Sequence, residues 1–131
     1  MTRFKKIVTV LIPLPHTYNP DVKGRRRPIA ASKYEETMTE IAESFGGGML
    51  WKFPPGSRPR GYWWNEGHLS RDILVVLEVD ITDNAATKLK IKRYAETVLL
   101  DRFAQDAIYL KFVPQVESEV VVCRRRRRNR E

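Results

Sequence analysis

The sequence predicts an α+β fold in which a four-stranded antiparallel sheet carries two helices on one face. Four segments have the composition and length of strands, at residues 4–12, 49–53 (with 61–64 after an interruption), 68–82 and 107–113. Two others, 32–45 and 84–105, repeat apolar residues at helical spacing. In the resulting order β–α–β–β–α–β, two right-handed crossovers place both helices on the same side of the sheet.

The first predicted strand, FKKIVTVLI at residues 4–12, is rich in β-branched residues and is expected to end at Pro13. The apolar run is too short, and too soon interrupted by Pro13 and Pro15, for a signal peptide or a membrane span. Residues 13–31 contain several prolines and a triple arginine, which predicts a long irregular loop.

The first helix is predicted at 32–45. Ser32 and Glu35 have the spacing of a capping box, and the glycines from Gly46 onward are typical of a helix end. The second helix, 84–105, is expected to begin at Asp83 or Asn84, both good capping residues.

The remaining strands surround a hairpin. MLWKF at 49–53 is interrupted by PPGSRPR, after which GYWW at 61–64 is its resumption or a separate short strand. NEG at 65–67 predicts a tight turn into the long strand 68–82. AIYLKFV at 107–113 is expected to end at Pro114, and EVVV at 119–122 offers a further short edge strand.

This arrangement is the ferredoxin-like α/β plait, predicted over residues 1–114, with residues 115–131 as a basic tail. The stretches GYWWNEGHLSRDILVVLEVDITD and DRFAQDAIYLKF also resemble small uncharacterised bacterial ferredoxin-like domains, over about residues 49–113. That resemblance implies the architecture and carries no activity. The open sheet face is expected to serve a homodimer or a ligand.

Charge is concentrated near the end of the chain. The net charge is +8 over 131 residues, but residues 124–131 hold six arginines and one glutamate, so the other 123 residues carry only +3. Arginine-rich segments bind phosphate backbones with little sequence preference. The sequence therefore predicts contact with RNA or DNA, with a solvated tail as the alternative. The candidate residues are Arg25, Arg26, Arg27, Arg124, Arg125, Arg126, Arg127, Arg128 and Arg130.

A second hypothesis is a small-molecule pocket for an anionic ligand. It would lie between the 13–31 loop, the start of the first helix and the 63–72 hairpin, where a helix N-terminus favours anions. Alternation along a strand predicts one of Trp63 and Trp64 in the core and the other on the open face. The residues expected to line the pocket are Arg27, Trp63, Trp64, His68, Arg71 and Asp72.

Other chemistry finds less support in the sequence. His16 and His68, with Asp21, Glu66 or Asp72, have no close metal-binding spacing, so no metal or other cofactor is expected. Cys123 is the single cysteine, which excludes a disulfide within the chain and fits a cytoplasmic protein. The sequence thus predicts a binding or accessory protein rather than an enzyme, with a small-molecule binding protein or enzyme as the alternative.

Overall fold

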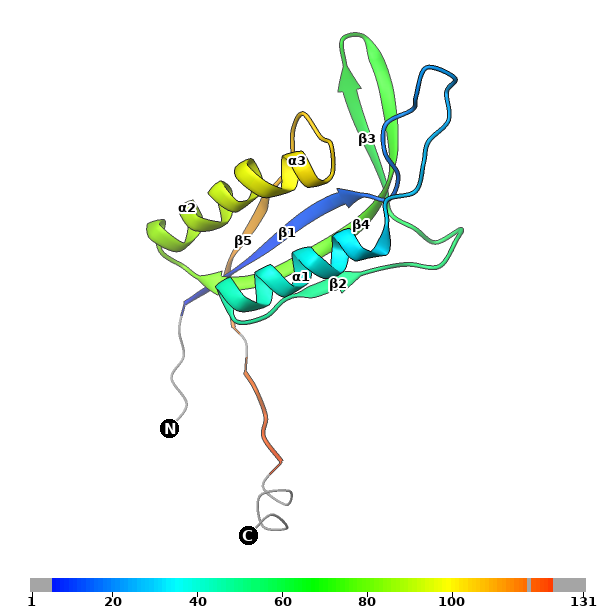
Figure 1. The fold of residues 1–131 in the computed structure, drawn as a ribbon. Helices are drawn as coiled ribbons and strands as arrows, with labels where there is room; N and C mark the ends of the chain where they lie inside the picture. The colour runs from blue at the N-terminus through cyan, green and yellow to red at the C-terminus, as the bar shows by residue number, and fades with distance from the viewer. Residues whose placement is uncertain (1–5, 118, 124–131) are drawn as a thin grey trace.

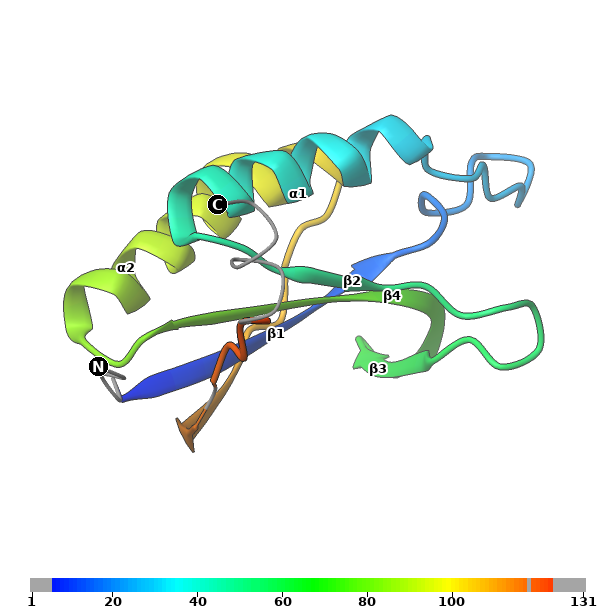
Figure 2. The same ribbon diagram turned by 90° about the horizontal axis from the view of Figure 1, so that it is seen from below.

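The computed structural model describes residues 6–117 and 119–123 and has the predicted α+β architecture. Both helices lie on one side of an antiparallel sheet (Figures 1 and 2), as expected for a ferredoxin-like fold. In chain order the elements are β1 (Ile7–Pro15), α1 (Ala31–Phe45), β2 (Met49–Trp51), β3 (Arg60–Asn65), β4 (His68–Thr82), α2 (Ala85–Tyr94), the π-helical segment η1 (Ala95–Leu99), α3 (Leu100–Arg102) and β5 (Lys111–Val116).

The sheet has five strands where the sequence predicts four. Its order is β2-β4-β1-β5, and β3 also pairs with β4. Trp51 lies opposite Val76, and Arg60 lies opposite Ile73, so β2 and β3 follow one another along β4 and are separated by residues 52–59. Of the two alternatives for residues 61–64, the structure therefore has a separate strand, β3, which pairs with β4 beyond the end of β2.

β1 continues through two prolines at which the sequence predicts its end. The His16 N–H donates to the Ile73 carbonyl at 2.9 Å, so even-numbered residues of β1 direct their amides toward β4. Pro13 and Pro15 therefore face the other edge, where pairing with β5 begins only at Leu11. Because no N–H is needed on that free edge, proline does not interrupt the strand. The irregular loop is correspondingly shorter and covers residues 16–30; we call it the β1–α1 loop.

The two ends of α1 differ in how well the sequence predicts them. The helix begins at Ala31 with Ala30 in the cap position and no side-chain cap, so the predicted capping box is wrong: Ser32 lies already inside the helix. Gly46 ends the helix in the left-handed conformation, with φ 89°, and its N–H donates to the Ala42 carbonyl. Glycine adopts this conformation without the cost that a Cβ imposes.

The second helical region begins as predicted and ends a few residues earlier. Asn84 caps α2, and its Oδ1 accepts the Thr87 N–H at 2.7 Å. The buried residues Ile91, Ala95 and Leu99 are spaced four apart, a spacing that drifts by about 40° per step around an α-helix. The wider turn of η1 reduces that drift and keeps the apolar stripe over the sheet.

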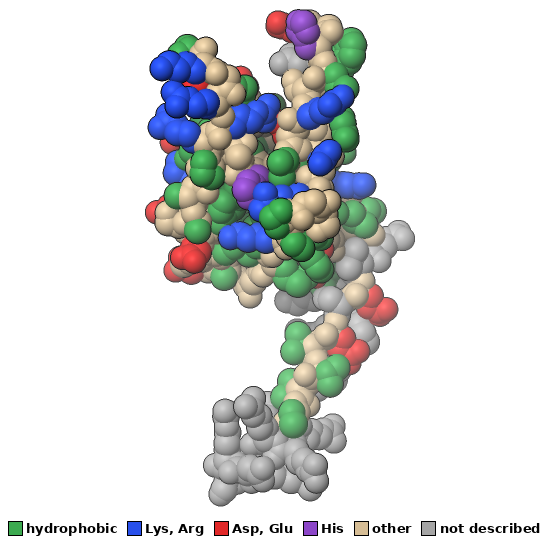
Figure 3. Space-filling view, turned by 90° about the vertical axis from the view of Figure 1, so that its right-hand side faces the viewer, with side chains coloured by type: hydrophobic (Ala, Val, Ile, Leu, Met, Phe, Trp, Pro, Cys, Tyr) green, Lys and Arg blue, Asp and Glu red, His purple; other side chains and the backbone are tan. Residues whose placement is uncertain are grey.

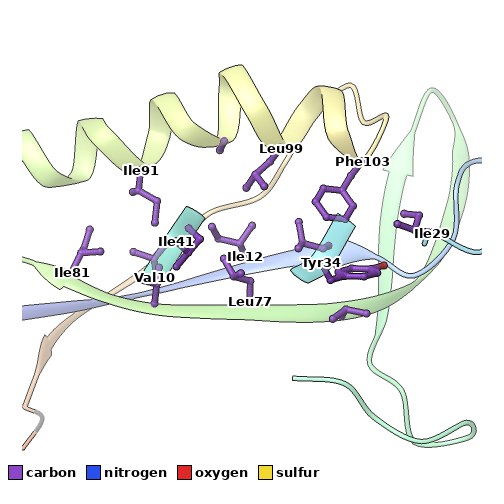
Figure 4. Packing of buried hydrophobic residues seen from close by; sticks show 14 of the residues in the cluster. Val10, Ile12, Ile29, Tyr34, Ile41, Leu77, Ile81, Ile91, Leu99 and Phe103 are labelled. Atoms are coloured by element: carbon purple, nitrogen blue, oxygen red, sulfur yellow. The ribbon is translucent and has the colours of Figure 1, made fainter. Parts of the chain in front are cut away.

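The core lies between the sheet and the helices (Figure 4). Alternate residues of β1 and β4 point toward the helices and are buried. Only in the second half of β4 does the sequence itself alternate, where Leu77, Val79 and Ile81 alternate with polar residues. The aromatic end of the core is formed by Phe103 and Tyr34, whose ring centroids are 5.3 Å apart. The buried apolar set includes Val8, Val10, Ile12, Leu14, Tyr34, Ile41, Val75, Leu77, Val79, Ile81, Ile91, Leu99 and Phe103.

The last strand is displaced along the sequence from its predicted position. β5 covers Lys111–Val116, rather than 107–113, and includes Pro114. A register shift between Ile7 and Thr9 of β1 accommodates this proline at the sheet edge. Residues 119–122, predicted as a further edge strand, have no regular secondary structure. The arginines from Arg124 to Arg130 lie outside the described residues.

No helix in the described part of the chain is both apolar enough and long enough to cross a lipid bilayer.

Candidate functional site

A β-hairpin and a loop project side by side from one end of the sheet (Figure 1). The hairpin is formed by β3 and the first half of β4, and the loop beside it is the β1–α1 loop. Glu66 and Gly67 form the hairpin turn, with φ 47° and 81°, as the NEG motif predicts for a two-residue turn. Figure 3 looks onto this end and shows the two projections separated by a gap.

The hairpin extends beyond the helices, and this changes the expected position of its tryptophans. Trp63 is 38% exposed and Trp64 is 75% exposed, so neither lies in the core. The two side chains do alternate, but no helix among the described residues covers either face of the ribbon at this point. The prediction that one tryptophan is buried is therefore wrong.

Between the hairpin and the β1–α1 loop is a cleft of about 770 Å³, which we call the hairpin cleft. Its third wall is the segment 105–109 that leads from α3 to β5. A volume of this size is typical of small-molecule sites. Apolar lining comes from Pro13, Pro15, Pro20, Trp63, Trp64, Leu74, Ala107, Ile108 and Tyr109, and polar lining from Asn19, Arg26, Ser70, Asp72, Gln105 and Asp106.

Trp63 is held in a defined position in the cleft. A Cβ added at Gly61 would lie 2.9 Å from Cζ2 of the Trp63 indole and 3.0 Å from Leu74 Cδ1, so the ring lies directly over the glycine. On another side, the ring centroid of Tyr109 is 6.3 Å away, with the planes tilted by 43°. Glycine at position 61 thus lets the indole pack against the strand and present a flat apolar wall.

One ion pair joins the β1–α1 loop to the hairpin at this cleft. Arg26 Nη1 donates to Asp72 Oδ1 at 3.0 Å, and the two side chains are 37% and 25% exposed. No local sequence pattern predicts this pair, because its partners are 46 positions apart in the sequence. It connects the two projections and supplies the cleft with both a hydrogen-bond donor and an acceptor.

The residues predicted for a pocket are only partly brought together. Trp63, Trp64 and Asp72 border the cleft, and Arg26 occupies the place expected for Arg27. Arg27 is exposed, and its carbonyl accepts the Tyr18 N–H. His68 is exposed beside the hairpin turn, Arg71 lies over the Tyr62 ring at 6.0 Å, and neither lines the cleft. The start of α1 does not line it either.

Residues 105–109 are the part of the site that sequence reasoning missed. The apolar run AIYLKFV predicts a strand, whereas in the structure the segment before Lys111 is irregular and Tyr109 is exposed. The tyrosine in this run is the one feature of the sequence that could have marked the segment as part of the site. It gives no indication that the Tyr109 ring lies beside Trp63.

A cluster of basic side chains surrounds His16 at the same end of the molecule. Partial burial lowers the pKa of His16, and the nearby charges of Arg58 and Lys52 lower that pKa further. The residues considered for a metal site are not assembled here, and no three His, Cys, Asp or Glu side chains gather as a metal site within 6–117 and 119–123.

The structure is that of a small protein with a ferredoxin-like fold and a cleft between a hairpin and a loop. Among solved structures, the chain is similar to the divalent ion tolerance protein CutA1 from Ehrlichia chaffeensis, with 8% identity and a TM-score of 0.52 over 88% of this chain and 86% of that chain. No protein-family model matches the sequence. No curated protein matches it either. At this level of identity the likeness shows the fold alone.

Proposed function

We propose that the protein is a small binding protein whose ligand occupies the hairpin cleft, and that it performs no chemistry there. The observation that carries this proposal is the Trp63 wall, fixed by Gly61 and Tyr109, facing a cleft that also contains the Arg26–Asp72 pair. A flat apolar wall with a few polar groups is typical of sites for planar organic molecules.

The charge of the cleft selects among such ligands. Arg26 already pairs with Asp72, and Asp106 adds a second carboxylate to the lining. These charges favour a neutral or cationic planar ligand over the anionic one expected from the sequence.

Thermal-shift screening of neutral, cationic and anionic planar compounds at high salt tests this proposal. A ligand of the cleft raises the melting temperature by mass action, and Trp63→Leu abolishes the rise. Trp51→Leu is the matched control, because Trp51 is 45% exposed but lies on β2, away from the cleft. Equal stabilisation of the Trp63→Leu variant would contradict the proposal.

A second candidate is nucleic-acid binding through the arginines at 124–130. It is supported by the charge distribution, since residues 124–131 carry a net +5 of the total +8. In the β1–α1 loop, Arg25 and Arg27 are exposed and can add phosphate contacts, whereas Arg26 is paired with Asp72.

This candidate is tested by binding to generic RNA and duplex DNA at two salt concentrations. We compare the natural chain with one in which the six terminal arginines are glutamine. The substitution should weaken binding and flatten its salt dependence, because fewer counterions are released. Equal affinity and equal slope would remove these arginines from the function.

Self-association through the open sheet face also remains a proposal. Met49 and Trp51 are 50% and 45% exposed on β2 and offer apolar contact there. Sedimentation of the Trp51→Glu variant tests it: a natural dimer that becomes monomeric supports it, and an unchanged mass contradicts it. A cytoplasmic location is proposed on the single cysteine alone.

A further inference from the structure

The hairpin has a second face, opposite to the one that borders the cleft. In the β3–β4 register Arg60 pairs with Ile73, Tyr62 with Arg71 and Trp64 with Leu69. Paired residues of an antiparallel ribbon share a face, and successive residues alternate between faces. We call the face formed by these three pairs the hairpin outer face. The cleft side carries the other pairs, Gly61 with Asp72 and Trp63 with Ser70. Trp64 belongs to the hairpin outer face by this register, and its large, 75% exposed side chain also borders the cleft.

The hairpin outer face is both apolar and exposed. Tyr62, Leu69 and Trp64 are 55%, 51% and 75% exposed, and Ile73 is 38% exposed. Isolated exposed apolar residues are ordinary, but four on one face of a two-stranded ribbon form a contiguous patch, which marks an interaction surface. In Figure 3 hydrophobic side chains follow one side of the hairpin projection.

The charges of this face have one sign. Arg60 and Arg71 are both exposed, and none of the six residues is acidic. The Arg71 guanidinium lies 6.0 Å from the Tyr62 ring centroid, so it is stacked beside an aromatic group rather than paired with a carboxylate. At the base of the hairpin, Lys52 and Arg58 add positive charge near His16.

Aromatic rings separated by arginines suit one kind of partner. Bases of a single strand stack on aromatic side chains whatever their identity, while arginines contact the backbone phosphates. A second copy of the chain suits the face less well, because the charged side chains that both copies bring to the interface would all be positive. We propose that the hairpin outer face binds single-stranded nucleic acid, with bases on Tyr62 and Trp64 and phosphates near Arg60 and Arg71.

This inference deepens the nucleic-acid candidate above but is carried by a different surface from the terminal arginines. Binding of fluorescein-labelled dT12 and rU12 to the full chain, followed by anisotropy, tests it. Removing one stacking platform weakens binding about 5- to 150-fold, so Trp64→Ala should lose affinity by that factor. Leu89→Ala is the control, because Leu89 is 47% exposed on α2, outside the proposed surfaces, and this variant should bind as the natural chain does.

Arg71→Gln supplies an independent measurement. If Arg71 neutralises one phosphate, its loss lowers the slope of log affinity against log salt by about 0.7 for a single strand. Because Trp64 is 75% exposed, its substitution should leave the melting temperature nearly unchanged, so lost binding does not reflect lost folding.

The design separates this surface from the terminal arginines. The Trp64→Ala ratio is measured again, at low salt, in the chain whose six terminal arginines are glutamine. A persistent 5- to 150-fold ratio supports the hairpin outer face even if the tail contributes most of the affinity. An unchanged affinity of Trp64→Ala in both chains would overturn the inference and leave the tail candidate standing. A Trp64→Ala variant that loses self-association but keeps oligonucleotide binding would also overturn it, because the face would then serve a second copy.

Discussion

Replacing Arg26 and Asp72 singly and together measures how firmly the β1–α1 loop is held against the hairpin. The variants are Arg26→Gln, Asp72→Asn and the double substitution, and the coupling free energy is the part of their effects that is not additive. Because the pair spans the cleft, this coupling measures how far the site is preformed.

The magnitude follows from the geometry. At 3.0 Å, the attraction between unit charges is roughly 1.4 kcal/mol in water and about 5.5 kcal/mol at an effective dielectric constant near 20. Ordering an arginine side chain costs up to about 2 kcal/mol, and the two partners remain 37% and 25% exposed. We therefore expect a coupling free energy of about 1 kcal/mol, at the upper end of the range for partly exposed pairs.

Urea denaturation of the four proteins gives the coupling, and the chain supplies its own control. Arg25 and Asp21 lie 3.9 Å apart with Arg25 70% exposed, so the same cycle at that pair should give a coupling near zero, about 0.3 kcal/mol or less. A coupling at Arg26–Asp72 no larger than at Arg25–Asp21 would refute the view that this pair fixes the loop to the hairpin.

Three further predictions concern the body of the protein. Phe103→Ala, which empties a fully buried site beside Tyr34, should lower the free energy of unfolding by about 3–5 kcal/mol in chemical denaturation; a loss under 1 kcal/mol would contradict the packing. Glu40 accepts two hydrogen bonds from Arg102, at 2.7 and 3.1 Å, and these bonds are the main reason that the pKa of Glu40 is lowered. Glu40→Gln should therefore lower the free energy of unfolding by about 1 kcal/mol at pH 7, and this loss should shrink as the pH falls below about 4.5. A loss that does not depend on pH would argue against the ion pair. His16 has a lowered pKa in the folded state, so the unfolded chain binds the proton first and stability falls as the pH drops below 6.5; His16→Asn should reduce that loss, and an identical pH profile would be the contrary result.

The sequence predicts the elements well where one local rule decides them. Gly46 ends α1, Asn84 begins α2, and Glu66–Gly67 turns the hairpin, because each residue type fits a particular backbone geometry. Alternation along β4 likewise predicts which of its residues enter the core.

Prediction from the sequence failed where contacts between residues far apart in the chain determine the local structure. Pro13 and Pro15 lie in a strand because β5 stops short of them, which no local pattern shows. Both hairpin tryptophans are exposed because the ribbon passes beyond the helices, and strand alternation contains no information on helix length. The Arg26–Asp72 pair depends on a loop folding back beside the hairpin.

The three tryptophans allow one measurement to test the account of the two hairpin faces. Trp63 lies on the cleft face of the hairpin, and Trp51 lies on β2. Trp64 lies on the hairpin outer face and also borders the cleft. In the chain labelled with ¹⁵N at its indole nitrogens, we predict that dT12 shifts the Trp64 signal and that a planar cleft ligand shifts the Trp63 signal. The Trp51 signal should stay in place in both titrations. A saturating oligonucleotide that shifts Trp51, or leaves Trp64 unmoved, would contradict the account.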